Sequence, residues 1–289
     1  MVRKLALLSA AICIFGNGLA QNKKAAENNS LLWKISGKNL AKPSYLFGTI
    51  HIICKDDYVW TEAMQAALDS SKKVVFEMDM DEPGFQEKMT AGLMLPEGKT
   101  LKDFYTGEEY GRLDKATQAQ GLPLGMFQKF SPFGLVSLLY IKASGCMLPE
   151  SYEGNIMQLA QQNHREILGL ESIGEQLQVV NGMDKDSLAK GALRMAESGD
   201  SLAQEYSGMV ALYKKQNLPE LYDNLLASPD YKNDLDGLLY NRNAHWVPEI
   251  EKLVHQDPVF IAVGAAHLWG DKGVIALLRK QGYTLTPVH

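Results

Sequence analysis

The sequence predicts an α/β fold: a central mixed sheet with pseudo-duplicated strand-Gly-x-x-His-helix units and helical insertions covering the sheet. Four short apolar segments have the β-branched or aromatic character of buried strands, and segments with helical periodicity follow or separate them. The order strand, Gly-x-x-His, helix occurs near both ends of the chain. Long stretches without a convincing strand lie between these units, and we expect them to be helical.

The expected elements follow one another in alternation along the chain. Strands are predicted over residues 45–47, 73–78, 166–170 and 259–263. Helices are predicted over residues 60–71, 151–163 and 272–281, the last of them ended by Gly282. Residues 85–143 and 179–254 form the two helical insertions, which are expected to cover the sheet or to act as a lid. Because strands alternate with helices, the sheet is expected to be largely parallel or mixed.

The first twenty residues have the features of an export signal. Arg3 and Lys4 precede an apolar run over residues 5–15, which is followed by the small-residue sequence Gly18-Leu19-Ala20. This run is shorter than the roughly 20 residues that span a bilayer, and no later apolar run approaches that length. We therefore expect cleavage after Ala20, a flexible leader over residues 21–30 and a single domain over residues 31–289, periplasmic or secreted and without a membrane span.

The composition is that of an ordinary globular chain and limits the partners. Of 289 residues, 46% are hydrophobic and 22% are charged, which excludes a disordered or collagen-like protein. The formal net charge is -5, and no stretch concentrates Lys or Arg. Because binding to nucleic acid depends on clustered positive charge, a nucleic-acid partner is not expected.

Two cysteines remain after the expected cleavage, Cys54 and Cys146. In an oxidising compartment they would form one disulfide, and two buried free thiols are the alternative. The sequence leaves both open, since it does not show whether the two residues are near each other.

Polar residues follow all four predicted strands. Gly48-Thr49-Ile50-His51 and Gly264-Ala265-Ala266-His267 come directly after two of them, and the other two end in Glu77-Met78-Asp79 and in Glu171. In open α/β sheets, ligands gather beyond the carboxyl ends of the strands, where a glycine allows the backbone to approach a ligand closely. We therefore expect His51, His267 and the two glutamates to share one edge of the sheet.

Two imidazoles and one or two carboxylates are a suitable ligand set for a divalent Mn, Zn, Co or Fe ion. Each residue alone also has a structural interpretation, as a hydrogen-bonded core histidine or as a carboxylate that caps a helix. Arg242 is a candidate for orienting the substrate or stabilising an oxyanion, and an ordinary salt bridge to Glu77 or Glu171 is its alternative. Cys54 is a weaker ligand candidate, and His164, His245 and His255 are expected on the surface.

Several common enzyme signatures are missing from the sequence. It contains no Walker phosphate loop, no Gly-x-Gly-x-x-Gly, no Gly-x-Ser-x-Gly and no His-Glu-x-x-His. None of these motifs therefore assigns the sequence to a different class of enzyme.

The motifs resemble those of the TraB/GumN family, which includes the Tiki metalloproteases. The resemblance covers about residues 31–288 and is carried by the segments 45–51, 76–79, 169–171, 242–243 and 261–267. It implies a fold akin to the erythromycin esterase and ChaN type. It also implies that His51 and His267 act as metal ligands and that Glu77 is the matching acid, as in the peptidase site of the Tiki branch.

The expected function is that of an exported metal-dependent hydrolase acting on a peptide or on a small amide or ester. The metal would polarise the substrate carbonyl and activate water, and a glutamate would take the proton, with Glu77 as first choice and Glu171 as second. Arg242 would assist the developing charge. The alternatives are a non-catalytic protein that binds haem or another ligand at the same edge, and a pseudoenzyme whose edge is purely structural.

Overall fold

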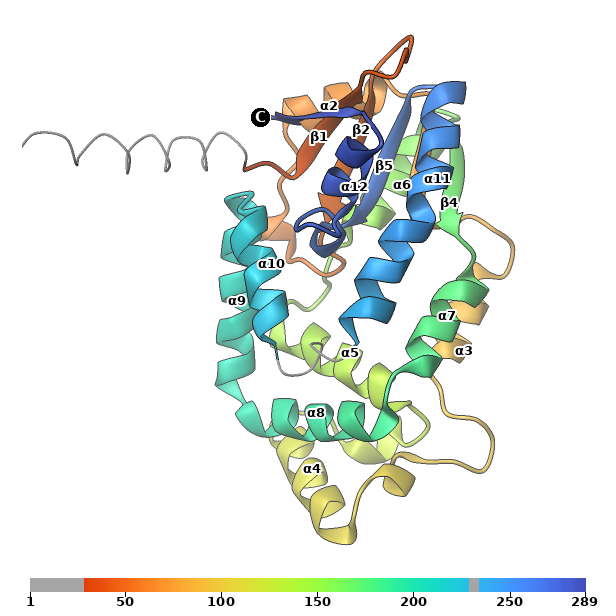
Figure 1. The fold of residues 1–289 in the computed structure, drawn as a ribbon. Coiled ribbons are helices and arrows are strands. Elements are labelled where there is room, and N and C mark those ends of the chain that lie inside the picture. The colour runs from red at the N-terminus through yellow and green to blue at the C-terminus, as the bar shows by residue number, and fades with distance from the viewer. Residues whose placement is uncertain (1–28, 229–233) are drawn as a thin grey trace, which may run out of the picture.

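A computed structural model describes residues 29–228 and 234–289 and contains a six-stranded mixed sheet (Figure 1). The strand order is β4-β3-β5-β2-β1-β6. The strands β2, β3, β4 and β5 pair in parallel, whereas β1 pairs antiparallel with both β2 and β6. The strands are β1 (Leu32–Ser36), β2 (Ser44–Thr49), β3 (Lys73–Met78), β4 (Glu166–Glu171), β5 (Val259–Gly264) and β6 (Thr284–Val288). The predicted fold class is confirmed, and each of the four predicted strands is present.

The strands β1 and β6 were not predicted. Both lie at the antiparallel end of the sheet, where Trp33 of β1 pairs with Pro287 of β6. Proline has no N–H to donate and is tolerated only at a sheet edge, which is the position of β6. Ser30, just before β1, is buried and its hydroxyl donates to the carbonyl of Val288 at 2.6 Å.

The predicted helices are present with slightly shorter bounds. The helix expected over residues 60–71 is α2, and its N-cap Thr61 accepts a hydrogen bond from the backbone N–H of Met64. The helices are α2 (Glu62–Asp69), α3 (Phe85–Gly92), α4 (Gly107–Ala119), α5 (Pro132–Ala143), α6 (Tyr152–Gln162), α7 (Ile173–Gly182), α8 (Lys185–Ser198), α9 (Asp200–Lys214), α10 (Leu218–Ala227), α11 (Asn241–Gln256) and α12 (Val274–Lys280). Four short 3-10 turns and one π-helical turn complete the elements in the described ranges: η1 (Lys55–Asp57), η2 (Leu101–Phe104), η3 (Leu124–Phe127), η4 (Asp236–Tyr240, π) and η5 (Ala265–His267).

Helices cover both faces of the sheet. Figure 1 shows α11 and α12 in front of it and α6 behind it. Phe47 of β2 packs against Tyr152 of α6, with ring centroids 5.6 Å apart. On the other face, the guanidinium carbon of Arg279 in α12 lies 5.3 Å from the centroid of the Trp33 ring. The sheet is therefore buried on both sides, as its apolar strands require.

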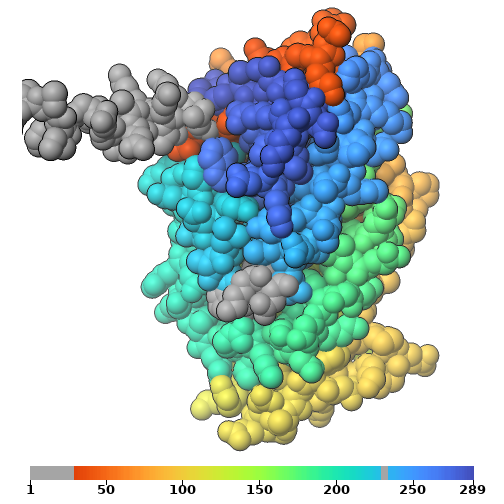
Figure 2. Space-filling model, in the orientation of Figure 1, coloured from red at the N-terminus to blue at the C-terminus, as the bar shows by residue number. Residues whose placement is uncertain are grey.

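The two helical insertions do more than cover the sheet. Helices α4, α5 and α8 share a second hydrophobic cluster, in which Leu113, Leu135 and Leu193 are buried. In the space-filling view, the yellow and green insertion segments form the lower part of the surface, below the blue C-terminal segment (Figure 2). Helix α9 joins the insertions to the sheet, since Tyr213 donates a hydrogen bond to the carbonyl of Gly48 at 2.8 Å.

The expected signal peptide and most of the expected leader, residues 1–28, lie outside the described residues. Within ranges 29–228 and 234–289, no helix combines the length and apolar character needed to cross a bilayer.

Cys54 and Cys146 form a disulfide, with their Cα atoms 5.6 Å apart. Of the two alternatives that the sequence left open, the bridge is thus the one present. It ties the segment after β2 to the segment before α6, where Ile53 and Glu150 also exchange two backbone hydrogen bonds of 3.0 and 2.7 Å. The bridge therefore clamps the loop that carries His51 to the start of α6.

Replacing both cysteines, as Cys54→Ala/Cys146→Ala, is expected to lower the free energy of unfolding by about 4 kcal/mol, because the bridge closes a loop of 92 residues. Equilibrium urea unfolding of the wild type and the variant measures this difference. Reduced wild type serves as the control and should unfold at the midpoint of the variant. An unchanged midpoint in the variant would contradict the stabilising role of the bridge.

Candidate active site

The predicted site residues meet at the carboxyl edge of the parallel strands. His51 follows β2 by two residues, Glu77 lies near the end of β3, Glu171 ends β4, and His267 lies in η5 directly after β5. The strand register aligns these ends, since Thr49 pairs with Gly264 and Met78 pairs with Glu171. Arg242 reaches the same place from the first turn of α11.

Three of these side chains surround one point beside Gly264. A Cβ added to Gly264 would lie 3.3 Å from Oε1 of Glu77, 3.6 Å from Nε2 of His51 and 3.6 Å from Cδ2 of His267. The two imidazoles are therefore close together, although 216 positions separate His51 from His267. A Cβ at position 264 would contact all three side chains and would be tight against Oε1 of Glu77.

His267 is held in one tautomer. Its Nδ1 lies 2.6 Å from Oδ1 of Asn243, an oxygen that only accepts, so Nδ1 carries the proton and Nε2 has the lone pair. The amide nitrogen of Asn243 donates to the carbonyl of Lys272 at 2.9 Å, which is consistent with this orientation of the amide. Burial lowers the pKa of His267 to about 3, so the ring is neutral.

His51 is held by Glu153, which was not among the predicted site residues. Nδ1 of His51 lies 2.7 Å from Oε1 of Glu153, and the same carboxylate accepts from Thr49 at 2.5 Å and from Ser151 at 2.8 Å. The charge of Glu153 and its hydrogen bond raise the pKa of His51 to about 9. The side chain of His51 is 66% exposed, whereas that of Glu153 is 11% exposed. The pair therefore presents an accessible imidazole on a buried carboxylate.

Arg242 links the two predicted glutamates. Its Nη2 lies 2.6 Å from Oε2 of Glu77, and its Nε and Nη2 lie 3.0 and 2.5 Å from Oε1 of Glu171. Its Nη1 donates to the carbonyl of Leu238 at 3.1 Å and lies 3.3 Å from Nε2 of His267. All three guanidinium nitrogens are thus engaged, as in the salt-bridge alternative for this residue.

Glu171 and Glu77 differ in the hydrogen-bond partners of their carboxylate oxygens. Both oxygens of Glu171 are taken up by Arg242 and by Nε1 of Trp246, which donates at 3.1 Å. Oε1 of Glu77 accepts from the backbone N–H of Gly264 at 2.8 Å and faces Nε2 of His267 at 3.8 Å. Burial raises the pKa of Glu77, but the charge of Arg242 and the hydrogen bond from the backbone N–H of Gly264 outweigh this effect and keep the pKa below its usual value. Glu77 is therefore an ionised carboxylate at the point where the imidazoles meet.

The remaining histidines and Cys54 lie where they were expected. His164, His245 and His255 are exposed. Cys54 is in the disulfide and is not available as a ligand. Glu153 and Asn243, which were not among the predicted site residues, are the hydrogen-bond partners of the two imidazoles.

The donor set has the chemistry of a divalent-metal site. Each imidazole uses Nδ1 for a hydrogen bond to a side-chain oxygen, which leaves Nε2 as the ligand atom, and this arrangement is common around metal-binding histidines. Oε1 of Glu77 lies 3.8 Å from Nε2 of His267 and, like Nε2 of His51, lies close to Gly264. In residues 29–228 and 234–289, no three His, Cys, Asp or Glu side chains already stand at coordination distance from one point. The types of residue present therefore fit a divalent metal ion. In this structure, Nε2 of His267 accepts a hydrogen bond from Nη1 of Arg242 instead.

These features define an α/β protein in which two oriented imidazoles and an ionised carboxylate meet at the carboxyl edge of parallel strands. The chain belongs to the TraB/PrgY/gumN family, whose sequence model matches residues 31–287. The resemblance noted from the motifs is thereby confirmed.

Named relatives of this chain are metalloproteases. It is 23% identical to Metalloprotease TIKI1 of Homo sapiens over 98% of this chain and 70% of that protein. The identity is also 23% to Metalloprotease TIKI1 of Xenopus tropicalis, over 91% of this chain and 62% of the relative. The chain is also 23% identical to Metalloprotease TIKI2 of Danio rerio, over 88% of this chain and 60% of that relative. The chain thus spans 60 to 70% of the length of these relatives. No solved structure matches it.

Proposed function

We propose that this protein is a metal-dependent hydrolase that cleaves peptide or other amide bonds. The observation that carries the proposal is the meeting of Nε2 of His51, the ring of His267 and Oε1 of Glu77 around the space beside Gly264. Both imidazoles are oriented by hydrogen bonds on Nδ1, which leaves Nε2 of each ring as the potential ligand atom; Nε2 of His51 faces this space, and Nε2 of His267 would exchange its contact with Arg242 for the metal. The metalloprotease relatives support a peptide as substrate.

The ligands in this proposal are His51, His267 and Glu77. A divalent ion such as Mn, Zn, Co or Fe, when bound there, supplies Lewis acidity toward a carbonyl oxygen and toward water. His267 is suited to this role because it is neutral and its tautomer is set by Asn243. The exposed ring of His51 provides the side of the site that a substrate can reach.

The acid and base roles follow from how each group is held. Glu77 is ionised and has an oxygen at the centre of the site, so we assign it as third ligand or as the base that takes a proton from water. Glu171 is the second choice for the base, since its oxygens are bonded to Arg242 and Trp246. Arg242 places positive charge 3.3 Å from Nε2 of His267, where it would stabilise a developing oxyanion.

The proposal includes export to the periplasm or the outside of the cell. It is supported by the signal-like residues 1–20 and by the disulfide, since such bridges persist in oxidising compartments. We also propose that residues 31–289 act as a single domain, because strands from both ends of this range share one sheet.

The proposed activity is tested by incubating the purified chain with a mixture of synthetic peptides and identifying products by mass spectrometry. We expect cleavage that stops in the presence of a chelator and returns when Mn, Co or Zn is added, because the ion supplies the Lewis acid. Cleavage that persists in the chelator would contradict the metal dependence. Haem absorbance without cleavage in any metal would support the ligand-binding alternative instead.

Replacing Glu153, as Glu153→Gln, is expected to weaken metal binding 10- to 100-fold, because the charged partner of the ligand His51 is lost while its shape remains. Isothermal titration calorimetry with Zn or Mn measures the affinity. The matched control is Glu150→Gln, since Glu150 lies nearby but bonds Asn155 rather than His51. Equal affinities of the two variants would show that Glu153 does not support a metal ligand.

A further inference from the structure

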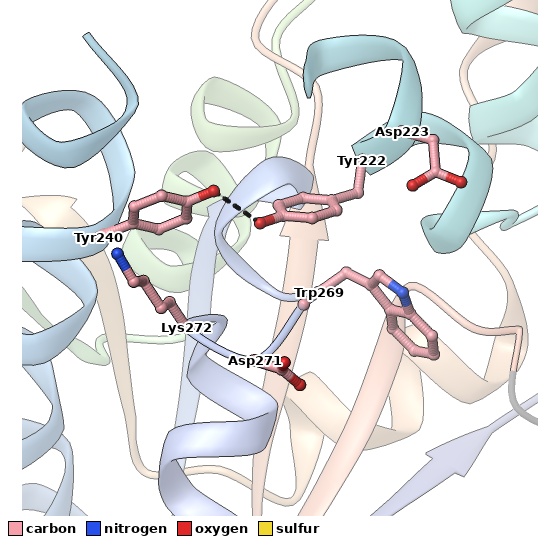
Figure 3. Close-up of a pocket in the computed structure, with 7 residues that line it drawn as sticks. Tyr222, Asp223, Tyr240, Trp269, Asp271 and Lys272 are labelled. Carbon is pink, nitrogen blue, oxygen red and sulfur yellow. Dashed lines mark hydrogen bonds between the residues drawn. The ribbon is translucent and has the colours of Figure 1, made fainter. Parts of the chain in front are cut away.

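A pocket with a volume of about 450 Å³ lies beside the candidate active site, and Figure 3 shows the side chains around it. This volume is within the range of about 300–1,000 Å³ that is typical of small-ligand sites. The labelled side chains are Tyr222, Asp223, Tyr240, Trp269, Asp271 and Lys272. They come from α10, from η4 and from the loop after η5. None of them has a role in the proposed chemistry.

The pocket is joined to the candidate active site through Asn243. The amide nitrogen of this residue donates to the carbonyl of Lys272 in the pocket loop, and its oxygen accepts from Nδ1 of His267. Along the chain, Tyr240 precedes Arg242 by two residues, and Trp269 follows His267 by two residues. A ligand in this pocket would therefore lie next to the elements that carry the catalytic candidates.

The aromatic wall of the pocket is preformed. The hydroxyl groups of Tyr222 and Tyr240 form a hydrogen bond of 2.9 Å, which joins α10 to η4. The ring of Tyr222 lies directly on the backbone of Gly270, where an added Cβ would come within 2.8 Å of the ring. Gly270 has a φ of +85°, so glycine is favoured there for two reasons.

The charges in the pocket are unbalanced. Lys272 lies 4.3 Å from the ring centroid of Tyr240 and 3.4 Å from Oδ1 of Asp236, so its ammonium already has partners. In the part of the chain that the structure describes, the carboxylates of Asp223 and Asp271 have no side-chain ion pair or hydrogen bond. Figure 3 shows Lys272 on the side of Tyr240 and Asp223 on the opposite side, beyond Tyr222. Two negative charges thus remain beside the aromatic rings.

We propose that this pocket binds the cationic side chain of a lysine or arginine in the peptide substrate. An ammonium or guanidinium group is attracted to the faces of Tyr and Trp rings, and here it would also neutralise Asp223 and Asp271. The apolar stem of such a side chain can lie along Trp269 while its charged end meets the carboxylates. That this cation belongs to a peptide substrate rests on the proposed function, whereas the preference for a cation rests on the pocket alone.

The test measures binding without catalysis. The probes are Nα-acetyl-L-arginine N-methylamide and the corresponding citrulline compound, which has nearly the same shape but no charge. Titration calorimetry of the whole chain with chelator present removes any contribution from metal or from hydrolysis. We expect the arginine probe to bind about tenfold more tightly than the citrulline probe, as a cation–π contact combined with a charge partner allows.

The double variant Asp223→Asn/Asp271→Asn is expected to bind both probes equally. Asp56→Asn/Asp186→Asn is the matched control, because it removes the same charge from two exposed aspartates outside the pocket and should keep the preference for arginine. Gly270→Ala should also weaken binding of the arginine probe, since it displaces Tyr222.

Equal binding of the two probes to the wild type, or an unchanged preference in the double pocket variant, would overturn the proposal. Selective arginine binding by a chain that cleaves no peptide would support the cation site and contradict the hydrolase function. The two proposals are therefore distinguishable.

Discussion

Either His51→Ala or His267→Ala is expected to abolish metal-dependent cleavage and to lower metal affinity by more than about 100-fold. Removing a hydrogen-bond partner of a metal ligand typically lowers metal affinity by about 10- to 100-fold. We expect a larger loss here, because the ligand itself is removed. Both rings lie within 3.6 Å of the same point beside Gly264, so neither can replace the other. Elemental analysis of the purified variants measures the metal content, and the peptide assay measures the activity.

The two variants should differ in stability. His51 is two-thirds exposed, so its removal should change the melting temperature little. His267 is buried against Trp246, with ring centroids 4.4 Å apart, and its loss leaves Oδ1 of Asn243 without its donor. We therefore expect a lower melting temperature for His267→Ala, by a few degrees, from a penalty of about 1–3 kcal/mol for an unsatisfied buried group.

A third variant, Gly264→Ala, tests whether metal is lost when the metal ligands remain but the space beside position 264 is filled. Gly264→Ala keeps every donor but places a methyl group 3.3 Å from Oε1 of Glu77, so it should also lose metal. His245→Ala is the control, because His245 is exposed on α11 and should retain full metal content. Equal metal in all of these proteins would refute the ligand assignment.

Arg242→Met is expected to lower the free energy of unfolding by about 3–5 kcal/mol, because it leaves the buried carboxylates of Glu77 and Glu171 without their counter-charge. The side chains involved are at most 9% exposed, so water cannot replace the guanidinium. Urea unfolding followed by circular dichroism measures the change.

The chain contains a matched control for this variant. Arg112 also forms a two-point pair, with Glu197 at 2.7 and 2.6 Å, but its side chain is 52% exposed. Arg112→Met should therefore change the free energy of unfolding little, because water screens the exposed pair. Adding Glu171→Leu to Arg242→Met should recover part of the lost stability, since it removes one uncompensated charge. Similar losses for the two arginine variants would mean that the buried network contributes no special stability.

The parallel strands were predictable because of where they lie. The strands β3 and β5 are central and buried on both faces, so their sequences are continuous apolar runs that stand out locally. The strands β1 and β6 are short and lie at the antiparallel end of the sheet, and β6 contains Pro287. Their sequences lack such a run, and their pairing depends on bringing the two ends of the chain together.

Individual acids and histidines of the site were predictable because each follows a strand in the sequence. Glu77 and His267 are recognised from their own neighbours, and the topology of parallel strands places them together. Glu153 gave no comparable signal, because it lies at the start of a helix and its partner His51 is 102 positions away. A search for acids at the start of predicted helices would have included it among several unrelated candidates.

The amino-acid sequence alone determined the α/β class, the four central strands and the two Gly-x-x-His motifs, because hydrophobic pattern and residue type are local properties of the chain. Only the tertiary structure decided that Cys54 pairs with Cys146, that Glu153 and Asn243 orient the imidazoles, and that Arg242 joins both glutamates. Such contacts depend on distance and burial between residues far apart in sequence, and these arise only when the sheet and helices pack together.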